Sequence, residues 1–328
     1  MPDQNDIYII AELSEEKHPT PLTLELMGLG KELAAGMGGD LHAVMPGEGM
    51  EAAAVELSRY GASGIFVLDH PALCDYNPDI YLPVLEGFFT DRSPRAIIIS
   101  HTSIGADLGP RLAFALGAGL VTDCVGARAE AGEIRLVRPV YGGNALATLR
   151  ATTDTVLATL RARVGSAPSP SGESEVTLVE AAVPAEIRIG LRGRERAVSA
   201  ECPLEEAAVV VTGGRGIGGA DGFEQLRELA RLFGGAVGAS RPPVDSGWAP
   251  TTCQVGITGK VVAPDIYIAV AISGSSQHLS GMSDSGKVVA INKDPEAYIF
   301  SVSDYGVVGD WRQVLPSFTA RCRDILNE

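Results

Sequence analysis

The sequence reads VVVTGGRGIGG at 209–219, GASRPPVDSGWAP at 238–250, QVGITGK at 254–260, YIAVAISGSSQHLSGM at 267–282, VVAINKDPEA at 288–297 and DYGVVGD at 304–310. Short glycine-rich or polar turns recur along this stretch. Three of them follow directly on the apolar runs 209–211, 266–272 and 288–291. A strand that runs into a glycine turn and then a helix offers backbone N–H groups to an anion, and the helix dipole adds to the attraction. Several such turns at one edge of a parallel sheet predict a crevice for a nucleotide cofactor.

The composition favours close-packed α/β layers and argues against several function classes. Of the 328 residues, 45% are hydrophobic but only 5% are aromatic, and 39 are glycine, which suits two α/β domains better than a β-sandwich. The formal net charge of −15 argues against binding to nucleic acid or to anionic membranes. No apolar run approaches the ~18–20 residues of a membrane helix, and the N-terminus shows no targeting signal. We therefore expect a cytoplasmic protein, from a bacterium or an archaeon.

The cysteines and histidines predict neither a disulfide framework nor a metal site. The five cysteines are scattered without CxxC spacing, and the five histidines show no HExxH or other paired spacing. Buried or reduced thiols are the expected state.

The first part of the chain alternates short apolar runs with helical patterns. This β-α alternation, with runs too uniformly apolar to be half exposed, predicts a parallel sheet covered on both faces. The expected strands are 7–11, 41–45, 64–68, 96–100 and 155–160, and the expected helices are 23–35, 50–60 and 83–90.

Further strands are expected before the end of this domain. Runs 120–127, 134–141 and 145–150 indicate a β-meander, and 176–183 and 187–191 are expected to complete the domain. The charged, irregular stretch that follows predicts a linker, with the boundary near Ala200. The predicted domains are therefore 1–200 and 201–328.

A polar turn follows the strand 96–100. Ser100, His101, Thr102 and Ser103 are placed at the carboxyl edge of the sheet, where ligands bind in such folds. Alternatively, Thr102 or Ser103 merely caps the next helix.

The second domain repeats the strand-turn-helix pattern and predicts an open, mainly parallel sheet. Gly214, Gly216 and Gly219 form a GxGxxG pattern, which is weak evidence by itself, and 240–250 reads as a rigid polar loop. The expected strands are 207–211, 236–240, 261–262, 266–272 and 288–291, and the expected helices are 223–233 and 314–326.

Taken in order, the motifs GGRGIG, SRPPVDSGW, QVGITGK, ISGSSQHLSGM, INKDPEAYIF and DYGVVGD resemble the α subunit of electron-transfer flavoproteins. YGGNALATLR at 141–150 also resembles that family, so the resemblance covers the whole chain. It implies an N-terminal parallel-sheet domain of nucleotide-hydrolase-like type that packs on a β subunit. It also implies a C-terminal doubly wound domain that holds one extended FAD, while the β subunit carries AMP or a second FAD.

The resemblance also assigns roles to residues. Arg215 would neutralise the pyrophosphate, Arg241 would lie over the isoalloxazine and favour anionic reduced flavin, and Thr258 would bond the central ring nitrogen. His278 would lie near the pyrimidine carbonyl and, if protonated, stabilise negative charge there. Asn292 would contact the adenosine part of FAD. Asp310 and Trp311 would close over its adenine end. The full set implied to bind FAD is Arg215, Ser240, Arg241, Gln254, Val255, Gly256, Ile257, Thr258, Ser273, Gly274, Ser275, Ser276, Gln277, His278, Asn292, Asp310 and Trp311.

Plainer interpretations stand beside these roles. Ser240, Ser273 and Asn292 are residue types that cap turns, and Arg241 is of the type found in surface ion pairs, which contribute little stability. His278 taken alone is more typical of a buried, hydrogen-bonded core residue. Only the joint order of the motifs favours cofactor binding.

The resemblance implies an electron carrier rather than a stand-alone enzyme. It would take electrons from flavin dehydrogenases of the acyl-CoA dehydrogenase type, as in fatty acid β-oxidation, and pass them to a quinone reductase or another acceptor. The first alternative is a subunit of a flavin-based electron-bifurcating, NADH-dependent complex. The second is a nucleotide-binding regulatory module without redox function. An NAD-dependent dehydrogenase is disfavoured, because AVGASRPP at 236–243 lacks the acidic residue expected about 20 positions beyond GxGxxG.

Overall fold

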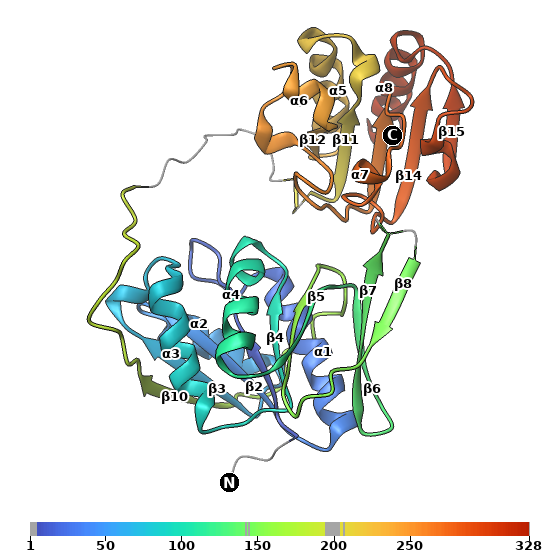
Figure 1. Cartoon of the computed structure of the whole chain (residues 1–328). Helices are drawn as coiled ribbons and strands as arrows, with labels where there is room; N and C mark the ends of the chain where they lie inside the picture. The colour runs from blue at the N-terminus through green and yellow to red at the C-terminus, as the bar shows by residue number, and fades with distance from the viewer. Residues whose placement is uncertain (1–4, 142, 144, 194–203, 206, 328) are drawn as a thin grey trace. The chain divides into compact units, whose positions relative to one another are not determined.

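The computed structural model describes residues 5–141, 143, 145–193, 204, 205 and 207–327. The chain divides into two compact units, Met1–Val140 with Ala145–Arg194 and Tyr141–Asn144 with Glu195–Glu328. The predicted boundary near Ala200 lies outside the described residues and stays a prediction. Figure 1 shows that each unit has its own sheet with helices around it.

The first unit is built on a parallel sheet of seven strands in the order β10-β3-β2-β1-β4-β9-β5. The chain runs outward from β1 through β2 to β3 and then returns to β4, so the direction of winding reverses between β1 and β4. The strands are β1 (Ile7–Ile10), β2 (Leu41–Gly47), β3 (Gly64–Asp69), β4 (Ala96–Ser100), β5 (Gly119–Cys124), β9 (Val156–Leu160) and β10 (Glu175–Glu180).

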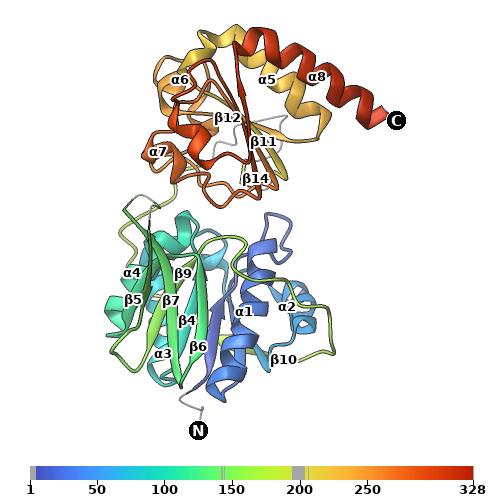
Figure 2. The ribbon, with the colours of Figure 1, turned by 90° about the vertical axis from the view of Figure 1, so that its right-hand side faces the viewer.

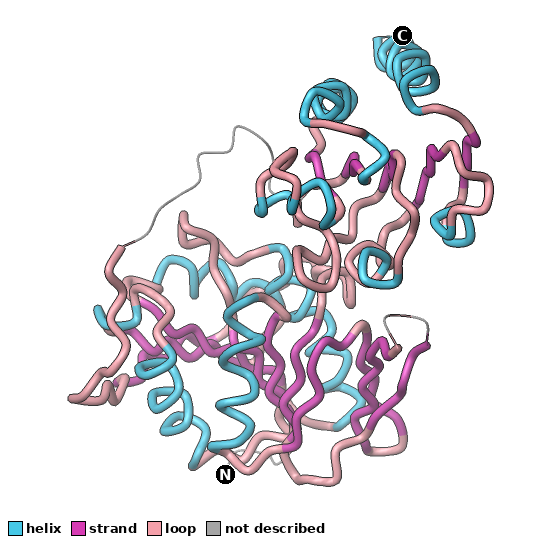
Figure 3. The backbone as a smooth tube through the Cα atoms, turned by 45° about the horizontal axis from the view of Figure 1, so that its top comes forward, coloured by secondary structure: helices cyan, strands magenta, loops and turns pink. Residues whose placement is uncertain are grey.

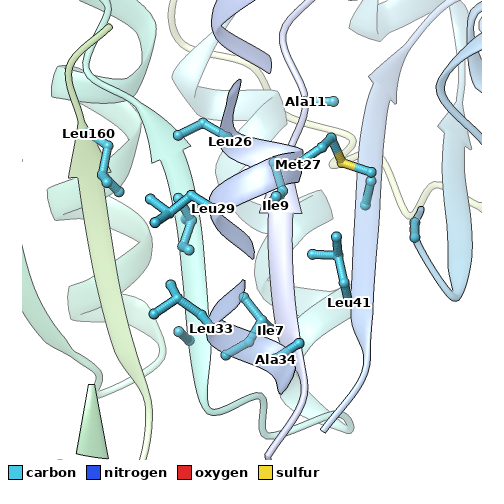
Figure 4. Close-up of a cluster of buried hydrophobic side chains, with 14 of the residues drawn as sticks. Ile7, Ile9, Ala11, Leu26, Met27, Leu29, Leu33, Ala34, Leu41 and Leu160 are labelled. Carbon is cyan, nitrogen blue, oxygen red and sulfur yellow. The ribbon is translucent and has the colours of Figure 1, made fainter. Parts of the chain in front are cut away.

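Helices cover both faces of this sheet, as the apolar strands predict. Successive residues of β1 alternate between the two cores: Ile7 and Ile9 pack with α1, and Tyr8 and Ile10 pack with α3 and α4. Figure 4 shows Leu26, Leu29 and Leu33 of α1 lying against Ile7 and Ile9. The helical segments are α1 (Pro21–Met37), α2 (Glu51–Leu57), η1 (Ser58–Tyr60), η2 (Pro71–Leu73), α3 (Pro78–Thr90) and α4 (Ser103–Ala115).

The expected β-meander is only partly correct. The run 120–127 was predicted as one strand, but β5 pairs in parallel with β9, and a separate strand begins at Gly126. The antiparallel meander consists of β6 (Gly126–Glu130), β7 (Glu133–Val140) and β8 (Ala145–Leu149), and Figure 2 shows β6 beside α1. Asp123, with a φ of 62°, lies in the irregular end of β5 and separates the two pairings. The strand expected at 187–191 is absent, since these described residues form no ladder.

The second unit contains a parallel sheet of five strands in the order β12-β11-β13-β14-β15, seen as magenta segments in Figure 3. The winding direction reverses between β11 and β13. The elements are β11 (Val209–Gly213), η3 (Arg215–Ile217), α5 (Ala220–Leu232), β12 (Ala236–Ala239), α6 (Arg241–Asp245), η4 (Thr251–Cys253), β13 (Ile266–Val270), α7 (Ser276–Leu279), β14 (Lys287–Asn292), η5 (Tyr298–Val302), β15 (Tyr305–Val308) and α8 (Trp311–Asn327).

The two faces of this second sheet are covered differently. Helices α5 and α8 pack together on one face, with Phe223 and Leu315 in the core beneath them. The other face is covered by the short segments α7 and η5 and by the turn around Val255, and no long helix packs there among the described residues. This thin cover leaves room for a cleft.

Three sequence-based assignments in this unit were wrong. The expected strand 261–262 is a loop, and the expected polar loop after residue 240 contains α6, whose two prolines lie in its first turn where no N–H partner is needed. The DYGVVGD motif was interpreted as a turn, but β15 pairs with β14 along it. Within the part of the chain that is described, no helix is long and apolar enough to span a bilayer.

Candidate functional site

A cleft of about 310 Å³ lies at the carboxyl edge of the second sheet. The ends of β11, β12, β13 and β14 all contribute to it, as expected for a site at the point where the winding reverses. Its volume is within the ~300–1,000 Å³ of typical ligand pockets. The lining residues are Gly214, Arg215, Gly216, Ser240, Arg241, Pro242, Gln254, Val255, Gly256, Ile257, Thr258, Ala271, Ile272, Ser273, Ser275, Gln277, His278, Asn292, Asp294 and Ala297.

A smaller cavity of about 70 Å³ adjoins the cleft, because Gly216, Ala271 and Asn292 line both. Asp310 and Trp311 belong to this smaller cavity. Together the two hollows form one path along the strand ends, which suits an extended ligand better than a compact one.

The turn after β11 packs directly on the end of β13. A Cβ on Gly214 would lie 2.1 Å from the backbone oxygen of Ala271, so no other residue fits there without displacing the backbone. Ala271 itself has a φ of 55°, an uncommon conformation for a residue with a side chain. The close approach of β11 and β13 thus brings Arg215 to the cleft, with an exposed side chain.

Ser240 and Arg241 follow β12 on one short segment. Ser240 is buried and precedes α6, but its hydroxyl does not cap that helix, so the capping interpretation does not hold for it. The Nε of Arg241 donates to Asp245 Oδ2 at 3.2 Å, and the arginine side chain is 65% exposed. Arg241 is therefore both a surface ion pair and part of the cleft lining.

The turn Gln254–Thr258 forms one wall of the cleft. Gln254 Nε2 donates to the Thr258 hydroxyl at 2.9 Å, which leaves the hydroxyl proton of Thr258 available to a bound acceptor. Ile257 N donates to the Gln277 carbonyl at 2.8 Å, so the turn is attached to α7. Hydrogen bonds thus hold the turn in place, while Thr258 lines the cleft and is exposed to solvent.

His278 is buried behind this wall, and both of its ring nitrogens lie within hydrogen-bond distance of a protein oxygen. Its Nε2 lies 2.9 Å from the Tyr267 hydroxyl, and its Nδ1 lies 3.2 Å from the Val255 carbonyl. Burial lowers the pKa of His278 to about 4, against an opposing effect of the Val255 carbonyl. The plainer interpretation of a buried, hydrogen-bonded histidine describes His278, although it also lines the cleft, and its contact with a cofactor stays a prediction.

Asn292 acts as a cap. Its Oδ1 accepts from Asp294 N at 3.0 Å, while its Nδ2 donates to the Ile272 carbonyl at 2.8 Å. The capping interpretation thus holds for Asn292, although the residue also lines both hollows. Asp294 in turn accepts from Glu296 N at 3.0 Å and caps the next turn.

Trp311 is part of the core more than of a lid. It is 5% exposed, and its indole N–H donates to the Gly216 carbonyl at 3.1 Å, which fixes the turn after β11. The guanidinium of Arg312 lies 4.8 Å from the indole ring centroid. Trp311 therefore braces the turn that presents Arg215.

The structure brings most of the predicted residues to one place. Gly274 and Ser276 lie beside the cleft but do not line it; a Cβ on Gly274 would lie 2.3 Å from Ile299 N, so this glycine serves packing. The lining residues outside the predicted set are Gly214, Gly216, Pro242, Ala271, Ile272, Asp294 and Ala297 in the cleft, and Ile291, Lys293, Gly309 and Arg312 in the smaller cavity. Most of these are neighbours of predicted residues in sequence, so extending each motif by a residue or two would have found them.

In the first unit, the polar turn after β4 is a helix cap. Thr102 Oγ1 accepts from Gly105 N at 3.1 Å and caps α4, and the Thr102 hydroxyl donates to Glu12 Oε1 at 2.8 Å. His101 Nδ1 lies 2.7 Å from Thr159 Oγ1, and His101 Nε2 lies 3.5 Å from Asp123. His101 thus has a hydrogen-bond partner in Thr159, and Thr102 has partners in Glu12 and the Gly105 N–H. The capping alternative holds for Thr102.

Replacing Glu12 with glutamine is expected to stabilise the protein at high pH. Burial raises the pKa of the Glu12 carboxyl from 4.5 to about 7, against the hydrogen bond from Thr102. The folded state therefore holds the carboxyl proton up to a higher pH than the unfolded state does. The free energy of unfolding falls as pH rises from 4.5 to 7, and above pH 7 the loss is on the order of 3 kcal/mol. In thermal unfolding, the melting temperature should fall less between pH 5 and pH 8 in Glu12→Gln than in the wild type. Equal losses in both proteins would contradict this, and exposed Glu16→Gln is the control.

A single group of described residues has metal-ligand geometry, and its members already have partners. Asp6, Asp40 and His42 offer atoms within 4.8 Å of one another. Asp6 Oδ1 accepts from Asp40 N, Asp40 Oδ1 accepts from the Ser63 hydroxyl, and His42 lies 3.5 Å from Asp6. These contacts explain the group without an ion.

Comparison with known proteins gives the family. The family model of the electron transfer flavoprotein domain matches residues 7–186, and that of the electron transfer flavoprotein FAD-binding domain matches residues 203–283. Electron transfer flavoprotein subunit alpha from Thermoanaerobacterium thermosaccharolyticum is 39% identical over 321 residues, which cover 96% of this chain and 97% of that protein. The chain belongs to the electron transfer flavoprotein α-subunit family.

Other family members are similar over most of their length. Electron transfer flavoprotein subunit alpha from Bacillus subtilis is 36% identical and covers 93% of both chains. A protein named lactate dehydrogenase (NAD(+),ferredoxin) subunit LctC, from Acetobacterium woodii, is 34% identical over 90% of this chain and 72% of that protein.

The cleft of this electron transfer flavoprotein chain fits a flavin dinucleotide in its chemistry. The cationic side chains of Arg215 and Arg241 suit a pyrophosphate and a ring that gains negative charge. The hydroxyls of Ser240 and Thr258, and the extension past Asn292, suit the polar chain between the two ends of FAD. The residues present therefore fit the cofactor after which the family's second domain is named.

Proposed function

We propose that this chain is the FAD-carrying α subunit of a heterodimeric electron transfer flavoprotein. It would take electrons from flavin dehydrogenases of the acyl-CoA dehydrogenase type and deliver them to a quinone reductase or another acceptor. The observation that carries this proposal is the cleft at the strand ends, with Arg215 and Arg241 in its lining, within a domain of the FAD-binding family. The expectation of a cytoplasmic protein stays a prediction.

Bound FAD would supply the redox chemistry, and the protein would supply binding and charge. Arg215 would hold the pyrophosphate at the turn after β11, which Trp311 braces. Arg241 would favour the forms of the flavin ring that carry negative charge. The Thr258 hydroxyl would donate a hydrogen bond to a ring nitrogen. None of these side chains would form or break a covalent bond, so the chain would act as an electron carrier.

A β subunit is proposed to complete the site. Several residues of the cleft lining are exposed to solvent in this chain, among them Ile257 at 62% and the Arg241 side chain at 65%. The relatives are themselves named as alpha subunits, which supports a second subunit. We propose that it carries AMP or a second FAD.

A second candidate function is that of a subunit in an electron-bifurcating complex. The relative from Acetobacterium woodii, named for lactate, NAD(+) and ferredoxin, favours this alternative. In that case the β subunit would carry a second FAD and react with NADH.

The test is co-purification of the chain with its β subunit, followed by extraction of bound nucleotides and stepwise reduction. One FAD and one AMP per pair would support the carrier. Two FAD and reduction by NADH would support the bifurcating complex. A folded pair without flavin would contradict both, and would favour a regulatory nucleotide-binding module.

A further inference from the structure

A group of polar side chains lies at the carboxyl edge of the first sheet, in a different unit from the cofactor cleft. Its members, together named the edge cluster, are His101 after β4, Asp123 at the end of β5, Arg161 after β9 and Arg138 on β7. The side chains of His101 and Asp123 are each 25% exposed, and that of Arg161 is 11% exposed. The edge cluster is therefore recessed into the unit.

The carboxylate of the edge cluster already has a partner. The Nε of Arg161 donates to Asp123 Oδ1 at 2.5 Å, and its Nη2 donates to Asp123 Oδ2 at 2.9 Å. This is the two-pronged geometry in which arginine binds a carboxylate most strongly. Both oxygens of Asp123 are thus engaged by Arg161.

Arg138 enters the edge cluster from the antiparallel sheet. Val125 N donates to the Val137 carbonyl at 2.8 Å, which holds β7 beside the end of β5. Because side chains alternate along a strand, Arg138 shares the face of β7 with Ile134 and Leu136, and both of these are buried in the core that includes α1. The side chain of Arg138 is therefore directed toward the protein interior.

The guanidinium of Arg138 has no acceptor among the described residues. Its Nε is buried without a hydrogen-bond partner, and no described carboxylate lies within ion-pair distance of it. A buried N–H of a charged group that finds no acceptor is rare in folded proteins, because it destabilises the folded state. Arg138 therefore requires an acceptor that the described side chains do not supply.

The edge cluster carries an excess of positive charge. The charged groups that act on the His101 imidazole are one carboxylate and the two guanidinium groups: burial lowers the pKa of His101, the carboxylate opposes this, and both arginines add to it. One carboxylate against two guanidinium groups leaves one positive charge uncompensated, in a chain whose formal net charge is −15. An anion is favoured at such a place.

We propose that the edge cluster binds a small oxyanion of the phosphate type, with Arg138 as its main contact. A guanidinium presents parallel N–H groups that match two oxygens of one phosphate, so the buried Nε and a neighbouring Nη would bind side by side. Because the surrounding side chains are mostly buried, a free ion reaches this donor more readily than a side chain on the surface of a partner. The site is separate from the FAD cleft and does not depend on it.

The test is equilibrium dialysis of the intact, FAD-loaded complex against ³²P-labelled inorganic phosphate, with ionic strength held constant by sodium chloride. Bound FAD keeps phosphate away from Arg215. We expect the wild type to bind one more phosphate per complex than Arg138→Gln does, and sulfate but not chloride to displace it. Arg138→Lys keeps the charge but loses the Nε donor, so it should weaken phosphate binding roughly tenfold.

Arg128→Gln is the matched control, because Arg128 lies on the neighbouring strand β6 with a side chain that is 55% exposed and paired with Glu130 at 3.5 Å. It should bind phosphate as the wild type does. Equal binding by the wild type and Arg138→Gln would mean an adventitious ion only. No phosphate on the wild type, with loss of the β subunit from Arg138→Gln, would assign the acceptor to a carboxylate of that subunit. Either result would overturn the proposal. If Arg138→Gln does not fold, Arg138→Lys decides, and unweakened binding in that variant would count against the site.

Discussion

Gly214→Ala is expected to abolish FAD binding and to lower the free energy of unfolding by about 3 kcal/mol. The added Cβ would lie 2.1 Å from Ala271 O and 2.7 Å from Ala271 C. Both are backbone atoms, so no side-chain rotation relieves the clash, and the ends of β11 and β13 must separate. That separation displaces Arg215 from the cleft. Denaturant unfolding and FAD titration of the purified complex measure the two effects.

The matched control for this change is Gly219→Ala, at the other end of the same turn. A Cβ on Gly219 meets nothing within 4 Å, and its φ of 165° is extended backbone that any residue adopts. We expect wild-type stability and FAD affinity for Gly219→Ala. If Gly214→Ala binds FAD as tightly as Gly219→Ala does, the close approach of β11 and β13 is not what shapes the cleft.

Arg241→Ala is expected to make the bound flavin harder to reduce. A cation in the cleft lining stabilises negative charge that develops on the ring, and its removal weakens binding of the reduced form more than that of the oxidised form. A tenfold difference corresponds to about 60 mV for one electron, so we expect the one-electron potential to fall by roughly that amount. Spectroscopic redox titration of the complex gives the value.

Two variants control for the loss of an arginine. Arg323 on α8 pairs with Glu228 at 2.6 Å away from the cleft lining, so Arg323→Ala should leave the potential unchanged. Asp245→Asn removes the partner of Arg241 and should raise the potential slightly, because the guanidinium charge is then less compensated. A potential that is insensitive to both Arg241→Ala and Asp245→Asn would mean that Arg241 is only a surface ion pair.

Much of the fold could be predicted from local patterns. Uniformly apolar runs such as 96–100 and 288–291 predicted buried parallel strands, because a strand covered on both faces has no polar side. The errors lie where local sequence suits two states. Residues 305–308 form β15 with every residue exposed, and their short run YGVV, interrupted by Gly306 and followed by Gly309, suits a turn as well as a strand. The prolines in α6 indicated a loop but are compatible with the first turn of a helix.

The roles within the site were less predictable than its location. Thr102 and Asn292 each accept a hydrogen bond from a backbone N–H and therefore act as caps, while the contact of Asn292 with a ligand stays a prediction. The hydrogen-bond partners of His278 include Tyr267, eleven residues away on another element. Such partners are not visible in a motif.

By itself, the sequence determined the family, the two layered parallel sheets and the edge on which the polar turns meet. These follow from the order of the motifs and from the rule that parallel strands end on the same side. Only the tertiary structure decided that His278 is buried and hydrogen-bonded to Tyr267, that Asn292 caps a turn and that Trp311 braces the turn after β11. The physical reason is that a hydrogen bond or a pKa belongs to a pair of groups and their burial, and folding brings these groups together from distant parts of the chain.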